Sequence, residues 1–369
     1  MLLRLTCWVT IAPPHKMKTS LLLVATSLLI ALHQVPVAKG HGAMLLPHSW
    51  LDMKQWVKTK DGYKYDYVGL KSEQQCYAGA TIPRELLCPK ASDCGGYPYP
   101  GPVCMWFNNY TFVEKPTLFD PKLRTYAHNE YPPWVLHHPW RAPGAAPITS
   151  PCGVSGGNHN GCSGGPKCGQ NAGGFANGPK MEDVDFVHDI YVTNWTRGAA
   201  VEVAWAIRAN HGGGYSYRLC KLPEEGRKAL TEECFQETPL RFVGDKQWVQ
   251  FGEDESTRFE FQAVRTDQGT TPAGSQWTKN PIPACNGLSG GYNDPNPSCI
   301  NGTQFPPPRS DLEGFGVDPK NTMKAFPFSI IDLVRIPKDL EAGDYVISFR
   351  WDCEQSYQVW NTCASVKLE

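Results

Sequence analysis

The sequence lacks an excess of charge of either sign. Its 369 residues include 35 Lys and Arg against 36 Asp and Glu, a formal net charge of -1. Proteins that bind nucleic acids or anionic membrane surfaces usually carry clustered basic charge. After residue 40 the sequence also has no apolar run of the about 20 residues that span a bilayer. We therefore expect neither nucleic-acid binding nor a membrane anchor.

Several motifs of common catalytic and binding sites are missing as well. Cys162 and Cys168 are separated by five residues, whereas about two separate the cysteines of most zinc-binding pairs, so a disulfide is the better interpretation. The glycine-rich segment 151–179 has no Gly-Lys-Ser/Thr of a phosphate-binding loop. There is no nucleophile elbow, and no carboxylate pair can be identified by spacing. Zinc, nucleotide and hydrolase sites are therefore not predicted.

Glycine and proline are abundant, with 35 and 32 residues, and this composition favours a loop-rich β protein over a helical bundle. Apolar residues at every second position predict a half-buried strand over 200–209, whose apolar face would carry Val201, Val203, Trp205 and Ile207. Further strands are predicted over 258–264, 328–336, 345–351 and 364–368. Short strands separated by Gly and Pro turns predict an all-β sandwich.

The first forty residues have the layout of a secretory signal peptide. Residues 17–20 form a short basic start, 21–32 form an apolar run, and Ala38 and Gly40 are small residues close before His41. The apolar run is too short to span a bilayer, although a membrane anchor is the alternative interpretation. We expect residues 1–40 to be removed, with Met17 as an alternative start, and the mature protein to be secreted.

Cysteine is abundant, with 14 residues, of which only Cys7 precedes His41. In an exported protein such cysteines are expected to form disulfides. Because an odd number remains after residue 40, at least one thiol is free or pairs with another chain. Three Asn-X-Thr sequons, which fit a glycosylated secreted protein, begin at Asn109, Asn194 and Asn301.

The strand pattern breaks down over about 51–180. The segments 94–104 and 151–179 are rich in Gly, Pro and Cys and show no periodicity. A long irregular stretch of this kind usually carries function or is held by cross-links. We expect one domain, 41–369, with a long disulfide-stapled insertion, and two domains as the alternative.

His41 is the most informative residue, because removal of the first forty residues would make it the amino terminus. Its α-amine and one imidazole nitrogen would then form a chelate on a metal ion. The α-amine has an ordinary pKa of about 7.7–8.0, so a metal displaces its proton readily near neutral pH. One further imidazole would complete an all-nitrogen site that suits Cu(II). Cleavage elsewhere would make His41 incidental.

His211 is the best candidate for the second imidazole. It follows the predicted strand 200–209, and three glycines after it would let a substrate or metal approach. An ordinary turn histidine is the alternative. The competing histidines are His128, His137, His138, His159 and His188. His137 and His138 are adjacent on extended backbone, so their side chains would point apart.

Three segments together resemble the chitin-binding type-4 group of lytic polysaccharide monooxygenases. They are His41-Gly42-Ala43-Met44 behind the signal peptide, ANHGGGYSYRLC at 209–220, and RWDCEQSYQVWNTCASVKL at 350–368. The stretch around His211 is most similar to the animal branch of the group. The resemblance covers the strand core from His41 to Leu368, whereas much of 51–180 has no counterpart in the smaller members.

The resemblance implies an immunoglobulin/fibronectin-III-like β-sandwich that carries one copper ion on a flat face. The copper would be held by the amine and ring of His41 and the ring of His211. The position of the family's axial aromatic residue falls on Trp360, where the family usually has Phe or Tyr, and Ser365 replaces the family's Asp. Tyr357 is a weaker axial candidate. Gln358 would hydrogen-bond a bound oxygen species, and Glu354 could do the same and transfer a proton.

The activity that the resemblance implies is oxidative cleavage of glycosidic bonds in insoluble chitin or cellulose by a monomeric enzyme. It would need an external electron donor and O₂ or H₂O₂. Exposed aromatic residues would stack on sugar rings, and the candidates near the ligands are Trp50, Tyr215 and Tyr217. The alternatives on the same fold are a non-catalytic binder of chitin or matrix and a copper carrier.

Overall fold

The computed structural model describes most of the chain from His41 to its end. The described residues are 41–50, 56–59, 62–65, 106–108, 111–118, 120–123, 133–155, 180–184, 190–251, 254–286, 299, 302–310, 312–314 and 328–369. The predicted signal peptide, and much of the predicted insertion, lie outside this part of the chain. In the described part, no helix is long and apolar enough to cross a membrane.

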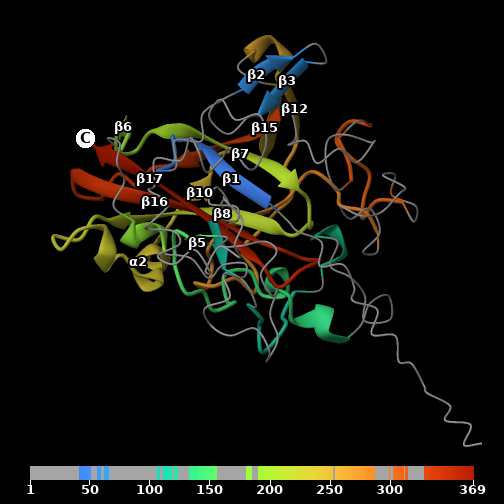
Figure 1. Ribbon diagram of the computed structural model, residues 1–369, viewed down its shortest axis with the longest axis horizontal. Coiled ribbons are helices and arrows are strands. Elements are labelled where there is room, and N and C mark those ends of the chain that lie inside the picture. Colours follow the sequence, from blue (N-terminus) through green and yellow to red (C-terminus); the bar gives the residue numbers. More distant parts are fainter. Residues whose placement is uncertain are drawn as a thin grey trace, which may run out of the picture. The chain divides into compact units, whose positions relative to one another are not determined.

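Two sheets dominate the fold, and their strands are antiparallel except for one parallel pair (Figure 1). The first sheet has the order β1 (His41–Leu46), β7 (Ala200–Ala209), β15 (Phe328–Arg335), β11 (Lys246–Phe251) and β12 (Phe259–Gln262), with β10 (Arg241–Phe242) beside β15. The all-β sandwich predicted from the sequence is thereby confirmed.

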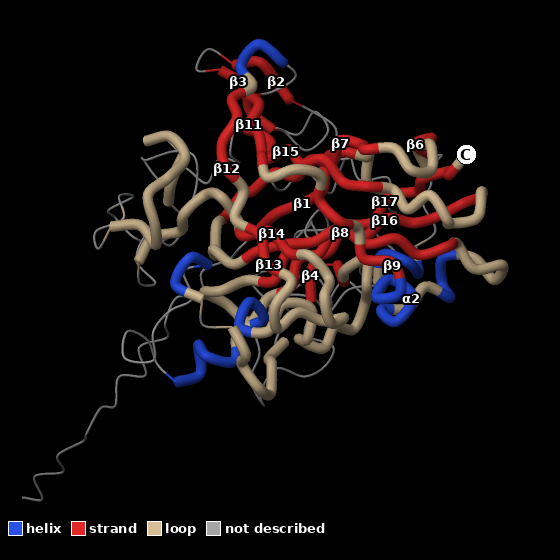
Figure 2. The backbone as a smooth tube through the Cα atoms, turned by 180° about the vertical axis from the view of Figure 1, so that it is seen from behind, coloured by secondary structure: helices blue, strands red, loops and turns tan. Residues whose placement is uncertain are grey.

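The second sheet has the order β13 (Arg265–Thr266), β14 (Trp277–Lys279), β8 (Gly214–Lys221), β16 (Gly343–Asp352), β17 (Val359–Leu368), β4 (Trp106–Asn108) and β5 (Val154–Ser155). The edge strands β6 (Val192–Trp195) and β9 (Thr238–Pro239) pair with β17 and β8, and the parallel pair is β6 with β17. A separate hairpin is formed by β2 (Trp56–Thr59) and β3 (Gly62–Tyr65). Figure 2 shows the strands from behind.

Helices are few and short in the described residues. The α-helix α2 spans Glu232–Glu237, and it begins where the Thr231 side chain accepts a hydrogen bond from the Cys234 amide. The 3-10 helices are η3 (Pro121–Leu123), η4 (Pro133–His137), η5 (Pro139–Arg141), η6 (Met181–Asp183), η7 (Arg227–Ala229) and η8 (Glu255–Thr257). Proline begins three of these, which fits its fixed φ at the first helical position.

Aromatic side chains from both sheets meet in the core. The Trp205 ring of the first sheet lies 4.7 Å from the Tyr215 ring and 5.1 Å from the Trp351 ring of the second, centroid to centroid. Strand β7 was predicted over the same residues, but its half-buried character is wrong between Val203 and Ile207, where every side chain is buried. The strand lies inside the sheet between β1 and β15, and alanines occupy its second face.

Three disulfides staple the described residues, as the cysteine content predicted. They join Cys152 to Cys363, Cys220 to Cys234, and Cys285 to Cys299. The first ties the predicted insertion to β17, and β4 and β5 of the same insertion extend the second sheet. Cys353 is a buried free thiol. Cys162 and Cys168 lie outside the described residues.

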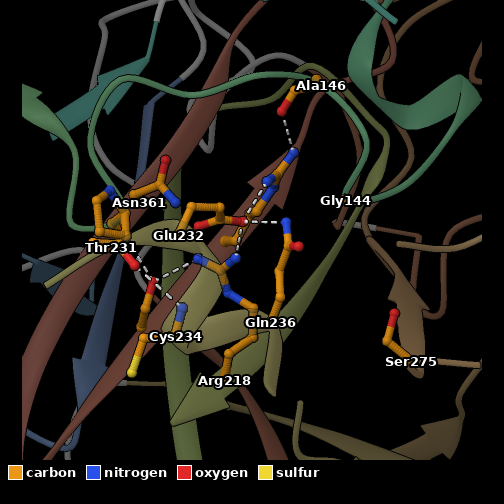
Figure 3. A network of polar contacts seen from close by, with 12 residues as sticks. Gly144, Ala146, Arg218, Thr231, Glu232, Cys234, Gln236, Ser275 and Asn361 are labelled. Atoms are coloured by element: carbon orange, nitrogen blue, oxygen red, sulfur yellow. Dashed lines mark hydrogen bonds and ion pairs between the residues drawn. The ribbon is translucent and has the colours of Figure 1, made fainter. Parts of the chain in front are cut away.

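A buried ionic network fixes α2 to the second sheet (Figure 3). Glu232 accepts hydrogen bonds from Arg218 and, at 2.8 Å, from Arg350. Arg350 also bonds Asp352 at 2.7 Å. Burial alone would raise the pKa of Glu232, but the two guanidinium groups outweigh it and lower that pKa. The network is therefore charged and mutually compensated.

Candidate functional site

The start of β1 and the end of β7 lie side by side. His41 pairs with Ala209 across the two strands, with a register shift directly after it, and His211 follows Ala209 by two residues. The backbone therefore brings the two predicted copper ligands to the same end of the first sheet. In the full chain the nitrogen of His41 is an amide bonded to Gly40, and only cleavage at that bond would make it an amine.

The loop that carries His211 is held by hydrogen bonds on both sides. The Asn210 side chain donates to the Ile282 carbonyl at 2.9 Å and accepts from the Asn280 side chain at 2.9 Å. The His211 carbonyl accepts from the amides of Glu354 and Gln355, at 3.2 and 3.0 Å. His211 is thus placed by its backbone. Its side chain is buried, which differs from the copper site on a flat face that the resemblance implies.

The glycines after His211 pack tightly against their neighbours. The prediction that they leave an open approach for a substrate or metal is therefore wrong. Gly212 and Gly213 have φ of 61° and 81°, a region that favours glycine. A Cβ on Gly212 would lie 2.5 Å from the Gln304 side-chain oxygen, and one on Gly213 would overlap the Asp352 carbonyl. These glycines allow a close turn of the backbone against its neighbours.

Trp360, the predicted axial residue, is buried and stacks on Phe107 with the centroids 4.4 Å and the planes 14° apart. It lies opposite Trp351 in the β16–β17 pair, and directly opposite residues share a face of the sheet. Phe107 belongs to the predicted insertion, so the insertion supports this ring. That Trp360 is axial to copper stays a prediction.

The two predicted polar residues lie in the turn between β16 and β17 and are buried. Glu354 accepts a hydrogen bond from the Gln304 side chain at 2.8 Å. The Gln358 side chain accepts one from the Ser356 hydroxyl at 3.3 Å. The backbone bond from the Glu354 amide to the His211 carbonyl places this turn beside His211. Gln304 was missed in the sequence, because it lies about fifty residues from its partner in an irregular segment.

The three aromatic residues predicted to stack on sugars cannot do so in this structure, because Trp50, Tyr215 and Tyr217 are each 0% exposed. The two tyrosines point into the core from β8, and the Trp50 indole donates to the Ser365 hydroxyl at 2.9 Å. Closeness to His211 in sequence indicated where these residues lie but not which way their side chains point. That prediction is wrong.

A different aromatic residue is exposed beside the 354–358 turn. Phe112 is 40% exposed, and its ring lies 5.5 Å from that of Tyr357. The backbone holds this pair together, because the Thr111 amide donates to the Tyr357 carbonyl at 3.0 Å. No pattern in the sequence indicates this surface, since Phe112 lies in the stretch without periodicity.

Of the competing histidines, the structure describes two. The rings of His137 and His138 diverge as expected, because they bond different carbonyls, those of Val113 at 2.7 Å and Glu354 at 2.9 Å. The predicted extended backbone is wrong for His137, which ends η4. Burial lowers the pKa of His138 to about 4. The other three, His128, His159 and His188, lie outside the described residues.

Two observations bear on whether these residues could hold copper. Within the described part of the chain, no group of three or more His, Cys, Asp or Glu side chains is arranged to hold a metal ion. The predicted copper site, a histidine brace made by the amine and ring of His41 and the ring of His211, needs only two such side chains. The pairing of His41 with Ala209 brings the backbone of His41 close to the His211 loop.

One predicted glycosylation site is described. Asn194 is exposed on the edge strand β6, where a glycan has room. Asn109 and Asn301 lie outside the described residues. All three stay predictions.

Comparison with known proteins gives a distant relationship. No protein-family model matches the chain. The AA13 family lytic polysaccharide monooxygenase A of Aspergillus terreus is 24% identical over 192 residues, which are 48% of this chain and 41% of that protein. The chain therefore matches less than half the length of this curated relative.

Solved structures of similar proteins were also found. One is a lytic polysaccharide monooxygenase AA15 from Thermobia domestica in the Cu(I) state, with 14% identity over 55% of this chain and 71% of that chain and a TM-score of 0.23. Another is the cellulose-active CelS2 in complex with copper, with 12% identity over 89% and 98% and a TM-score of 0.26. Scores this low carry no argument about function.

The chain is thus similar to lytic polysaccharide monooxygenases at low identity. The animal branch predicted from the motifs is not singled out, since the curated relative comes from Aspergillus terreus.

Proposed function

We propose that the chain, after cleavage behind Gly40, is a secreted copper-dependent monooxygenase of chitin or cellulose. The amine and ring of His41 and the ring of His211 would hold one copper ion. The observation that carries the proposal is the pairing of His41 with Ala209, two residues before His211. The similarity to a lytic polysaccharide monooxygenase supports it from the sequence.

Copper, when bound, supplies the one-electron chemistry that O₂ or H₂O₂ needs and that protein side chains lack. The residues around the site would serve this chemistry by position. Glu354, fixed by Gln304 at 2.8 Å, would hold or deliver a proton. Gln358 would orient a polar group by its amide, and the Trp360 ring would exclude water from one side.

The substrate would lie against Phe112 and Tyr357. A flat aromatic ring offers a sugar the apolar contact that the C–H face of a pyranose requires. Phe112 is the exposed member of this pair, and the half-buried Tyr357 belongs to the turn that carries Glu354. An exposed face suits an insoluble polymer that cannot enter a cleft.

A second candidate function is a non-catalytic binder of chitin or matrix on the same fold. The full burial of His211 favours it, because a brace that cuts a surface-bound polymer needs access to its copper. A copper carrier would share the metal site but would not oxidise sugars.

Copper titration by EPR and calorimetry separates these functions. Protein that starts at His41 would be compared with a variant that has one extra residue ahead of it and with His211→Ala. The enzyme requires tight copper binding with nitrogen hyperfine structure, lost in both variants, and oxidised sugars from chitin or cellulose with an electron donor. Equal, weak binding in all three proteins would overturn the copper site and favour the structural binder. Tight binding without oxidised products would favour the carrier.

A further inference from the structure

One indole ring contacts the residue after His41 and the residue after His211. The Trp351 indole N–H donates to the Gly212 carbonyl at 2.7 Å. On its other side the ring packs against Gly42, where a Cβ would lie 2.8 Å from Cζ3 and 2.9 Å from Cε3. The whole side chain is buried.

The ring reaches across the sandwich to make these contacts. Gly42 belongs to β1 and Gly212 follows β7, both in the first sheet, whereas Trp351 belongs to β16 of the second. In the second sheet Trp351 lies opposite Tyr215 and Trp360. A single side chain therefore links the two sheets at the end where His41 and His211 lie.

Both contacts constrain the same Trp351 ring. Side chains other than glycine at position 42 would displace the indole, because a packed core has no spare volume there. Loss of the N–H would leave the buried Gly212 carbonyl without this donor. Gly212 is also packed against the Gln304 side chain, whose oxygen lies 2.5 Å from the position of a Cβ on Gly212.

We propose that Trp351 is a positioning residue that sets the spacing between the His41 and His211 segments. Its relevance to copper rests on the proposed function, but the coupling of the two segments does not. The proposal also explains why a glycine follows His41, since the ring occupies the space of a side chain at that position.

The first test uses the metal-free, processed protein. Trp351→Phe keeps an aromatic ring and removes the N–H donor. The matched control is Trp277→Phe, another buried tryptophan, whose N–H bonds Ser275 at 3.2 Å. By amide hydrogen exchange, we expect Trp351→Phe to speed exchange about tenfold both in 42–44 and in 212–214. The control should leave both segments unchanged. Unchanged exchange, or a change in one segment alone, would overturn the coupling.

A second variant guards against loss of folding. Trp351→benzothienylalanine replaces only the N–H by sulfur and keeps the shape of the ring. It should weaken copper binding about tenfold and alter the EPR hyperfine coupling, as loss of a supporting hydrogen bond does in other metal sites. Trp277→Phe should keep the wild-type spectrum. Copper binding equal to wild type in the Trp351 variant would refute the positioning role.

The two proposals can fail separately. If the wild-type protein binds no copper, the proposed function falls, while hydrogen exchange still decides whether Trp351 couples the segments. If copper binds tightly and the exchange rates do not respond, only the role of Trp351 falls.

Discussion

The Tyr215 hydroxyl donates a hydrogen bond of 2.6 Å to the Asp332 carboxylate in the middle of the sandwich. The Gln247 amide donates to the same hydroxyl, also at 2.6 Å. Burial raises the pKa of Asp332 to about 6, although Tyr215 and Arg265 oppose the shift. The core therefore contains a carboxyl group that holds its proton more tightly than an exposed aspartate does.

This pKa predicts that Asp332 destabilises the folded protein increasingly as pH rises from about 4 to 6. Asp332 holds its proton more tightly in the folded than in the unfolded state. The stability that this proton contributes at low pH is therefore lost as the pH passes the folded pKa. The free energy of unfolding of Asp332→Asn, relative to that of wild type, should rise by roughly 2 to 3 kcal/mol between pH 4 and pH 7. Urea unfolding at a series of pH values measures the difference. The exposed Asp339→Asn is the control; a flat difference for Asp332→Asn would contradict the assignment.

The ionic network predicts a large effect of Glu232→Gln. The change removes the carboxylate that Arg218 and Arg350 share and leaves two guanidinium groups buried side by side. Breaking a buried pair from one side costs about 3 kcal/mol or more. Glu233→Gln is the matched control, because Glu233 is the next residue of α2 and is exposed. Equal unfolding free energies for the two variants would show that the network does not stabilise the fold.

The strands could be predicted from the sequence where periodicity is strong. Strand β7 was predicted with its observed bounds, and β15, β16 and β17 were predicted within several residues at each end. Strand positions depend on local pattern, which a single sequence contains. The closeness of His41 and His211 was expected instead from the family resemblance.

Direction and long-range contacts could not be predicted. Tyr215 and Tyr217 are close to His211 in sequence, yet the strand turns both rings into the core. The Gln304 to Glu354 hydrogen bond and the packing of Trp351 on Gly42 join segments that are far apart in the sequence. No periodic pattern in the sequence relates such segments. Such contacts are set by how the sheets pack, because tertiary packing decides which partner a side chain meets.

The disulfides are expected to stabilise unequally. Cys152 and Cys363 are 211 residues apart in sequence, whereas Cys220 and Cys234 are 14 apart. If cross-links act by restricting the unfolded chain, replacing each pair by alanine costs about 5 kcal/mol for the first and about 3 for the second. Urea unfolding of the two double variants tests the order. A larger loss from the short loop would indicate that native contacts of the disulfide, and not the loop length, decide.

The exposed aromatic surface predicts a selective loss of polysaccharide binding. Phe112→Ala removes the exposed ring beside Tyr357. Tyr191→Ala is the control, because Tyr191 directly precedes β6 and is 56% exposed. If a sugar ring stacks on Phe112, its loss should weaken binding to chitin or cellulose roughly threefold to tenfold, because such contacts contribute about 0.5–1.5 kcal/mol. Tyr191→Ala should bind as wild type does. Binding isotherms on the insoluble polymer, with melting temperatures to confirm folding, measure both variants. Equal losses would indicate nonspecific adsorption through any exposed aromatic ring, and an unchanged Phe112→Ala would place the substrate on another surface.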